Sequence, residues 1–153
     1  MARLDDIAEP MRSHLRALPC QSFDETPWAE GPPLKERRVA LISTAGLQRR
    51  GDRPFAVGAN DYRVIPADIP AGELIISHIS TNFDRTGFQQ DWNVMFPLDR
   101  LHELAAAGEI GSVTAYHYSF MGATDPEAME PVARGLAGLL KQDNVDAVAL
   151  VPV

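Results

Sequence analysis

The sequence is poor in the residues that build metal sites and disulfides. Its 153 residues include one cysteine, Cys20, and four histidines, none of which form a His-x-x-x-His pair. A single thiol cannot close an internal disulfide, and zinc sites need ligands at short, regular spacings. We therefore expect no metal and no cofactor held by this chain, an incidental role for Cys20, and a cytoplasmic location.

Features of nucleic-acid and membrane proteins are also missing. The formal net charge is -7, and acidic residues interrupt both basic groups, Lys35–Arg38 and Arg49–Arg53. A phosphate backbone requires clustered Lys and Arg, and a membrane helix requires about 20 apolar residues in a row. The sequence therefore predicts neither a nucleic-acid partner nor a membrane helix. The N-terminus carries charges where a signal peptide would have its apolar core, so no secretory signal is expected.

Two common catalytic signatures are absent as well. No Gly-x-Ser-x-Gly elbow occurs, and the glycine-containing segment Gly108–Gly111 follows an expected helix rather than a strand. A dinucleotide fingerprint needs the opposite context, a strand that leads into a helix. By its residues alone, the chain is an α/β domain with a polar site loop and no evident nucleophile.

What the sequence does contain is an alternation of apolar strands and amphipathic helices. Helices are expected from Pro97 to Ala107 and from Pro126 to about Gln142. The runs expected to share one sheet are Val39–Ser43, Leu74–Ile79, Val113–Ser119 and Val145–Val151. Strands separated by helices imply right-handed crossovers. We predict an α/β fold with a mostly parallel sheet between helices, a flavodoxin-like or Rossmann-like three-layer arrangement, incomplete at its C-terminus.

The domain expected is a single one over residues 1–153. Residues 1–36 are interpreted as a short helix (Ile7–Leu18) and an irregular, proline-rich connector, and residues 37–153 as the core, with a long loop at Leu47–Asp61. The last apolar run, Val148–Val153, has no covering element after it. We therefore expect exposed apolar surface that favours a homo-oligomer.

The strand expected at Leu74–Ile79 leads into a polar loop, which suggests a ligand-binding or catalytic site. His78, Asn82, Asp84 and Arg85 follow its apolar residues. Ligands of open α/β sheets bind outside the carboxyl ends of strands, and a histidine there can act as acid, base or ligand. Asp84 beside Arg85 suits a substrate carboxylate. A histidine satisfied by the backbone and a simple loop ion pair are the alternatives.

Two further groups are candidates. Asp91 and Asn93 surround Trp92 just before the Pro97 helix, where such side chains often serve only as caps, and His117 lies near the end of another strand. We take His78, Asp84 and His117 as candidate catalytic residues. The candidate substrate-binding residues are Arg85, Asn82, Asp91 and Asn93.

Several blocks of the sequence carry a family resemblance. These are the Ile-Ser-His opening of Ile76–Arg85, the run Gln90–Leu101 (Gln-Asp-Trp-Asn-Val-Met-Phe-Pro-Leu-Asp-Arg-Leu), Gly108–Ser112 and Asp143–Val148. Together they resemble the glycine/sarcosine/betaine/D-proline reductase family, in its selenoprotein B subunit. The resemblance covers roughly Arg38 to the end of the sequence.

The resemblance implies a reductase subunit that cleaves a C–N bond of a small amino-acid-like substrate with a selenolate or thiolate. It also implies a pyruvoyl group on a partner subunit and electrons from a second selenoprotein or a thioredoxin-type donor. In the family, a strand like Val145–Val153 leads into a selenocysteine or cysteine, then two further residues and a cysteine. We therefore expect the redox residue just after Val153, and a 153-residue chain that is truncated and inactive alone.

Two other functions stay open on the residues. One is a non-redox α/β module that binds a ligand or regulates a partner, which would explain the missing nucleophile. The other is a different small thiol-dependent oxidoreductase that shares only the fold. An in-frame TGA codon after Val153, followed after two codons by a cysteine codon, would favour the reductase.

Overall fold

The computed structural model describes residues 3–19, 24, 28–80 and 83–153. The chain divides into two compact units, Met1–Glu30 and Gly31–Val153. The first contains the 3-10 helix η1 (Leu4–Asp6) and helix α1 (Met11–Ala17), which lies within the helix expected at Ile7–Leu18. The second unit carries the sheets and the predicted site.

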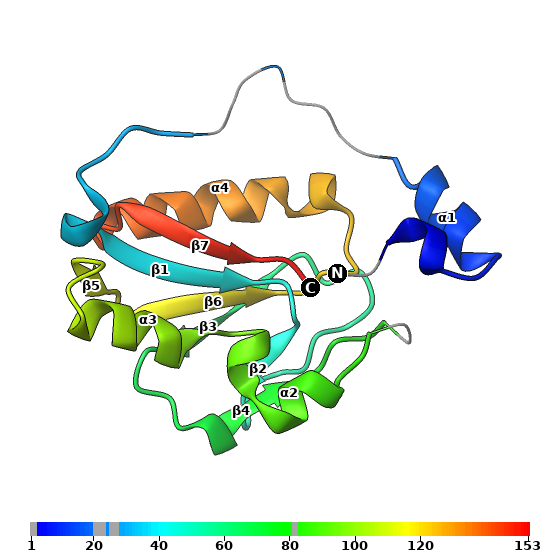
Figure 1. Cartoon of the computed structure of the whole chain (residues 1–153), viewed down its shortest axis with the longest axis horizontal. Coiled ribbons are helices and arrows are strands. Elements are labelled where there is room, and N and C mark those ends of the chain that lie inside the picture. Colours follow the sequence, from blue (N-terminus) through cyan, green and yellow to red (C-terminus); the bar gives the residue numbers. More distant parts are fainter. Residues whose placement is uncertain (1–2, 20–23, 25–27, 81–82) are drawn as a thin grey trace. The chain divides into compact units, whose positions relative to one another are not determined.

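The elements of the second unit are shown in Figure 1. Its strands are β1 (Arg38–Ser43), β2 (Leu47–Arg49), β3 (Tyr62–Pro66), β4 (Leu74–Ile76), β5 (Ser112–Val113), β6 (Tyr116–Phe120) and β7 (Ala147–Val151). Its helices are α2 (Thr86–Gln90), α3 (Leu98–Ala106) and α4 (Pro126–Gln142). Its 3-10 helices are η2 (Leu34–Glu36), η3 (Ala71–Glu73) and η4 (Trp92–Val94).

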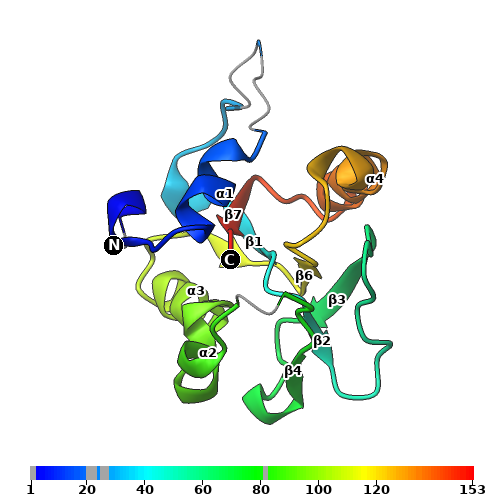
Figure 2. The same ribbon diagram turned by 90° about the vertical axis from the view of Figure 1, so that its right-hand side faces the viewer.

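The main sheet is built around β1. This strand pairs in parallel with β5 and β6 on one side and with β7 on the other, while β3 pairs antiparallel with β6. Helices α2 and α3 lie on one face of the sheet and α4 on the opposite face (Figure 2). The predicted fold class, a mostly parallel sheet between helices, is confirmed.

The alternation of residues along β1 fills both faces of the sheet. Val39 and Leu41 join the larger core beneath α3, and Ala40 joins a smaller core beneath α4. Successive side chains of a strand point to opposite faces, so a strand covered on both sides is apolar throughout. The apolar run Val39–Ser43 therefore indicates a strand that is buried on both faces.

One expected strand belongs to a different sheet from the one predicted. The segment Leu74–Ile79 was expected in the main sheet, but it forms only β4, which pairs antiparallel with β2 in a separate two-stranded sheet. Strand β2 lies inside the segment that was expected to be a long loop. Gly46, with φ of 65°, turns the chain directly after β1 and brings Leu47 alongside Ile76. A short apolar run does not encode its partner strand.

The expected helices are confirmed, and local signals explain their ends. Asp125 caps α4 by accepting a hydrogen bond from the Glu127 N–H at 3.0 Å, and the helix continues through Pro131. Gly108, at φ of 74°, ends α3. The run Val113–Ser119 is divided between β5 and β6, which both lie along β1. Within the described part of the chain, no helix has the length and apolar content to span a bilayer.

Candidate functional site

The carboxyl ends of three strands are tied together at one edge of the sheet. The N–H of Gly46, after β1, donates to the carbonyl of Phe120 at 2.9 Å, and the N–H of Gly122 donates to the carbonyl of Thr44 at 2.9 Å. The N–H of Thr44 also donates to the Val151 carbonyl at 3.1 Å. This is the edge at which parallel α/β sheets bind ligands.

Close packing fixes the segments that meet there. A Cβ at Gly122 would lie 2.8 Å from the Thr44 carbonyl oxygen and 3.0 Å from that of Val153. A Cβ at Gly46 would lie 3.0 Å from the Cα of His78. The Thr44 hydroxyl also accepts a hydrogen bond from the Val153 N–H at 2.9 Å. The end of β7 and the segment that carries His78 therefore both lie against these strand ends.

His78 is buried at this edge, with only 6% of its surface exposed. Its ring stacks on Phe83 with centroids 4.2 Å apart, and its Nδ1 accepts the N–H of Ser80 at 3.2 Å. Burial, together with the charge of Arg85, lowers the pKa of His78. The ring is therefore neutral and protonated on Nε2, and this buried nitrogen has no hydrogen-bond partner among the described residues.

Arg85 organises the loop around His78. Its guanidinium donates to the carbonyl oxygens of His78, Ser80 and Phe83, with the first of these hydrogen bonds at 2.5 Å. Asp84 does not pair with it in the described structure: it accepts the N–H of Thr86 at 2.9 Å, which lowers the pKa of Asp84. Both side chains thus contact the backbone rather than each other, and binding of a substrate carboxylate by Arg85 stays a prediction. Asn82 lies outside the described residues.

Asp91 and Asn93 form a capping network at the entrance to α3. Asp91 Oδ1 accepts the backbone N–H of Asn93 at 2.9 Å and its side-chain amide at 3.0 Å. The amide of Asn93 also donates to Asp99 at 2.8 Å, and Asp99 accepts the indole N–H of Trp92 at 3.0 Å. These contacts match the capping alternative weighed for this segment.

His117 is not brought together with His78. It is the second residue of β6, with no exposed surface, and its Nδ1 accepts the N–H of Leu41 at 2.9 Å. Its ring packs edge-on against Phe96. Burial, with a small contribution from His102, lowers the pKa of His117 to about 4. It therefore lies in the core beneath α3 as a neutral side chain, away from the carboxyl end of its strand.

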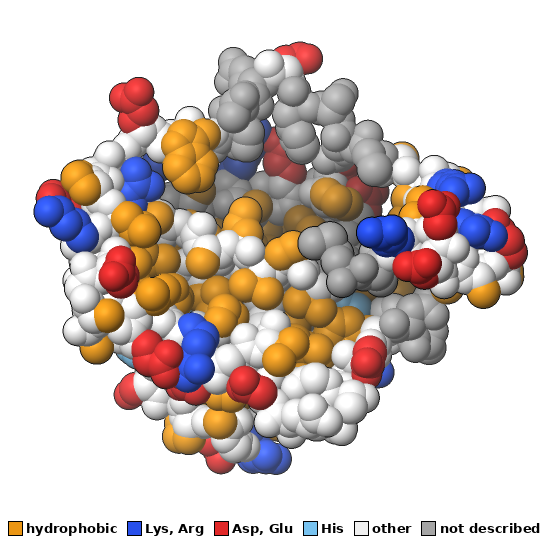
Figure 3. Space-filling view, viewed as in Figure 1, with side chains coloured by type: hydrophobic (Ala, Val, Ile, Leu, Met, Phe, Trp, Pro, Cys, Tyr) orange, Lys and Arg blue, Asp and Glu red, His pale blue; other side chains and the backbone are white. Residues whose placement is uncertain are grey.

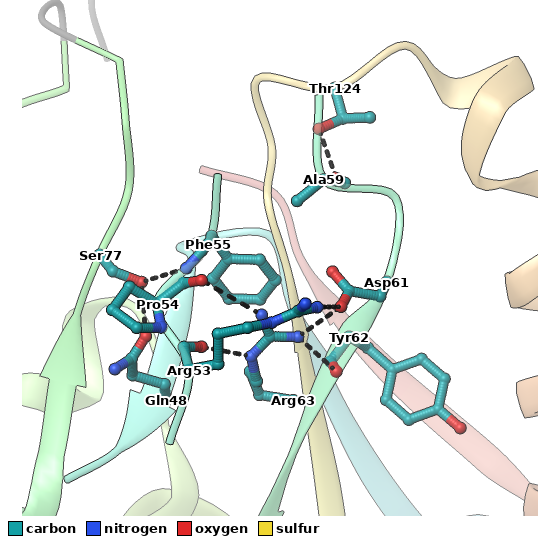
Figure 4. Close-up of polar contacts among 10 residues, drawn as sticks. All are labelled: Gln48, Arg53, Pro54, Phe55, Ala59, Asp61, Tyr62, Arg63, Ser77 and Thr124. Atoms are coloured by element: carbon teal, nitrogen blue, oxygen red, sulfur yellow. Dashed lines mark hydrogen bonds and ion pairs between the residues drawn. The ribbon is translucent and has the colours of Figure 1, made fainter. Parts of the chain in front are cut away.

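A buried arginine that sequence reasoning missed, Arg63, holds the loop that contacts Ser77, the residue before His78 (Figure 4). Arg63 lies over the ring of Phe55 at 4.2 Å and donates to the carbonyl of Arg53 at 2.8 Å and to Asp61 at 2.9 Å. The N–H of Phe55 then donates to the Ser77 hydroxyl at 3.2 Å. Arg63 thus holds the loop before β3 against the residue that precedes His78.

Two other contacts complete this support. The Ser77 hydroxyl lies 2.8 Å from Gln48 Oε1, and the Thr124 hydroxyl donates to the carbonyl of Ala59 at 2.7 Å (Figure 4). Ser77, which holds the loop through Phe55, is therefore bonded to β2, and the loop itself is bonded to the segment before α4. Its Gly, Arg and Asp content predicted only a loop, because no periodic pattern marks an ordered but irregular segment.

Comparison with known proteins now tests the resemblance. The family model described as glycine/sarcosine/betaine reductase selenoprotein B matches residues 16–153. The chain belongs to this family. The match includes the carboxyl edge, the His78 segment and the capping network, so the family assignment made from the sequence blocks is confirmed.

Three curated relatives illustrate the family. The D-proline reductase subunit gamma of Acetoanaerobium sticklandii is 32% identical over 76% of this chain and 49% of its own length. The betaine reductase complex component B subunit beta of Peptoclostridium acidaminophilum is 38% identical over 76% of this chain and 28% of its own length. The glycine reductase complex component B subunit gamma of Symbiobacterium thermophilum is 30% identical over 86% of this chain and 32% of its own length.

This chain therefore spans half or less of the length of these relatives. Their names describe a reductase subunit and components of reductase complexes. No solved structure matches this chain.

Proposed function

We propose that this chain is part of a reductase subunit that cleaves a C–N bond of a small amino-acid-like substrate. The observation that carries the proposal is the family match over residues 16–153, together with relatives named for reduction of D-proline, glycine and betaine. The carboxyl edge beside His78 is the proposed position of the substrate. The partners proposed are other subunits of the complex and a thiol or selenol electron donor.

The proposed reaction is a two-electron reduction. The C–N bond breaks with its electron pair leaving on the amine, which takes a proton, and the carbon ends bonded to hydrogen. A pair of thiol or selenol groups supplies the two electrons and is oxidised to a disulfide or selenenylsulfide, which the external donor reduces. The only thiol in these 153 residues is Cys20, outside the described residues, so we place the redox pair after Val153 and the amine-activating pyruvoyl group on a partner.

His78 is the residue of this chain proposed to act on the substrate. Because its Nδ1 already accepts the Ser80 N–H, and no described residue accepts from its Nε2–H, this N–H can donate a hydrogen bond to a substrate carboxylate. Its lowered pKa keeps the ring neutral, so the donor is present at pH 7. A buried donor without an acceptor costs about 1–3 kcal/mol, which a bound substrate would offset.

Arg85 is proposed to act mainly by holding the loop, since its guanidinium bonds three carbonyl oxygens around His78. Its positive charge also favours an anionic substrate nearby. The exposed carboxylate of Asp84, and Asn82, stay predicted contacts of the substrate beside His78. Asp91 and Asn93 are proposed to shape the site indirectly, through α2 and the start of α3.

A domain exchange tests the function. The region of the Acetoanaerobium sticklandii D-proline reductase subunit gamma that matches this chain is replaced by the corresponding residues of this chain. The chimera is then assembled with the other D-proline reductase subunits and a dithiol. We expect ring opening of D-proline to 5-aminopentanoate by mass spectrometry, with glycine and betaine tested in parallel. A chimera that assembles but reduces none of the three would refute the proposal.

The role of His78 is tested in the same chimera with a matched pair. Asn at position 78 retains an acceptor near Nδ1 but lacks the Nε2 donor, so His78→Asn should lower kcat/KM by about a hundredfold, the lower end of the effect of removing one positioned donor. His102→Asn, which removes an exposed histidine of α3, is the control and should leave turnover unchanged. Equal turnover in the His78→Asn chimera would exclude a direct role.

A further inference from the structure

The imidazole of His78 is held by two contacts that restrict different motions. Its Nδ1 accepts the N–H of Ser80 at 3.2 Å, which is at the long end of the ordinary range for a hydrogen bond. Its ring lies nearly parallel to the ring of Phe83, with centroids 4.2 Å apart and planes inclined by 16°. The terminal torsion of a histidine has only a broad, roughly two-fold preference, so the side chain does not fix its own ring plane. The stack therefore sets the plane of the imidazole, and the hydrogen bond sets which edge faces Ser80.

Phe83 can set this plane because it is itself held at several points. On the face of the molecule that carries α2 and α3, hydrophobic side chains gather across the middle (Figure 3). Phe83 is one of the partly buried side chains that pack against the larger core beneath α3. Its carbonyl accepts Nη1–H of Arg85 at 3.4 Å, and the guanidinium carbon of Arg85 lies 5.8 Å from the centroid of its ring. Phe83 is thus in contact with the core, with Arg85 and with His78.

We propose that Phe83 is a positioning residue for His78, because the flat face of its ring fixes the direction in which the Nε2–H points. This N–H lies on the edge of the imidazole away from Ser80, and no described residue accepts from it. A donor that is oriented before the substrate arrives needs no reorganisation when the substrate binds. The proposal rests on the proposed role of His78 and deepens it, because it names the residue through which the core controls this donor.

The role of the flat ring can be separated from that of apolar packing. Phe83→Leu keeps an apolar side chain against the core but removes the ring on which the imidazole stacks. Phe83→Tyr retains the ring and is the conservative variant. Phe88 is also partly buried against the same core, and among the ring contacts of the described residues none joins it to His78. Phe88→Leu is therefore the matched control, since it removes the same atoms from the same core.

The first test measures the motion of the imidazole in this chain, without turnover. Carbon-13 relaxation gives the order parameter of the ring C–H bonds of His78, whose signals are assigned by their loss in His78→Asn. Wild type, Phe83→Tyr and Phe88→Leu should give a rigid ring, with an order parameter of about 0.85, and Phe83→Leu should fall below about 0.6. Circular dichroism confirms that each variant is folded. A His78 ring as rigid in Phe83→Leu as in wild type would overturn the proposal.

The second test asks whether the effect on turnover passes through His78. In the D-proline reductase chimera, Phe83→Leu should lower kcat/KM by about tenfold, because a donor free to rotate is less often in the productive orientation. Phe83→Tyr should restore most of this loss, and Phe88→Leu should resemble the unsubstituted chimera. In the His78→Asn background, Phe83→Leu should cause no further loss, since the effects of residues that act as a unit are not additive.

Unchanged turnover in Phe83→Leu, or an equal loss in both backgrounds, would overturn the proposal, since Phe83 would then act independently of His78. The two proposals can also fail separately. If the unsubstituted chimera assembled but reduced no substrate, the proposed function would be refuted, whereas the order parameters would still decide whether Phe83 positions the ring.

Discussion

The buried His117 should make the stability of this protein depend on pH, and His117→Asn should remove that dependence. Asn retains an acceptor close to the position of Nδ1, so the hydrogen bond from the Leu41 N–H can persist. What the variant loses is the titrating ring. The quantity to compare is therefore the change of unfolding free energy with pH, rather than its value at one pH.

The size of the effect follows from the lowered pKa. Burial moves the pKa of His117 from 6.5 to about 4. The folded form excludes a proton that the unfolded chain binds, so its contribution is complete above pH 6.5 and is lost as pH falls toward 4. At about 1.4 kcal/mol per pH unit, the loss is about 3 kcal/mol.

Urea unfolding at intervals between pH 7.5 and 4, followed by tryptophan fluorescence, measures the two curves. Wild type should lose about 3 kcal/mol more than His117→Asn across this range. His14→Asn, which removes an exposed histidine of the first unit, should follow wild type. Parallel curves for wild type and His117→Asn would show that His117 is not held neutral in the folded protein.

Three further predictions concern the support of the site. Arg63→Gln should cost about 2–4 kcal/mol of unfolding free energy, because it leaves Asp61 and two loop carbonyls without their buried donor; a loss below 0.5 kcal/mol in urea would contradict this. Gly122→Ala should destabilise the fold by about 1–3 kcal/mol, because its Cβ would crowd two carbonyl oxygens. Gly138→Ala in α4, where a Cβ meets open space, should stabilise the fold by about 0.5–1 kcal/mol. Equal shifts in Tm for the two variants would be inconsistent with close packing at Gly122. Arg85→Gln should raise the pKa of His78 in an NMR titration, because it removes a neighbouring positive charge; a lower pKa would refute the assigned cause.

Local signals in the sequence located the elements whose ends are set by neighbouring residues. Asp125 and Pro126 mark the start of α4, and Gly108 marks the end of α3, because capping and the left-handed conformation act within one turn. The pairing of Leu74–Ile76 was not predictable in the same way. Its partner, Leu47–Arg49, is selected by the turn at Gly46 and by packing.

The candidate site shows the same division. His78 was found because it follows an apolar run, a signal that lies in the sequence itself. Arg63 was missed because its burial depends on Phe55 and Asp61, which the pattern of an irregular loop does not reveal. Arg85 was found by its chemistry, but the partners of its guanidinium are backbone carbonyls, which no sequence motif specifies.

The hydrogen bonds of Ser77 explain how an irregular segment can hold His78 in a fixed position. The N–H of Ser77 donates to the Gly46 carbonyl, and the Ser77 hydroxyl accepts the Phe55 N–H, so this residue is held by the end of β1 and by the Arg63 loop. His78 follows directly, and Gly46 allows its backbone to approach the strand end. The position of the His78 backbone is therefore set by the sheet edge, whereas Phe83 stacks on the ring. A substrate that enters at this edge would meet a donor whose backbone is held in place by these contacts, as the proposed role of His78 requires.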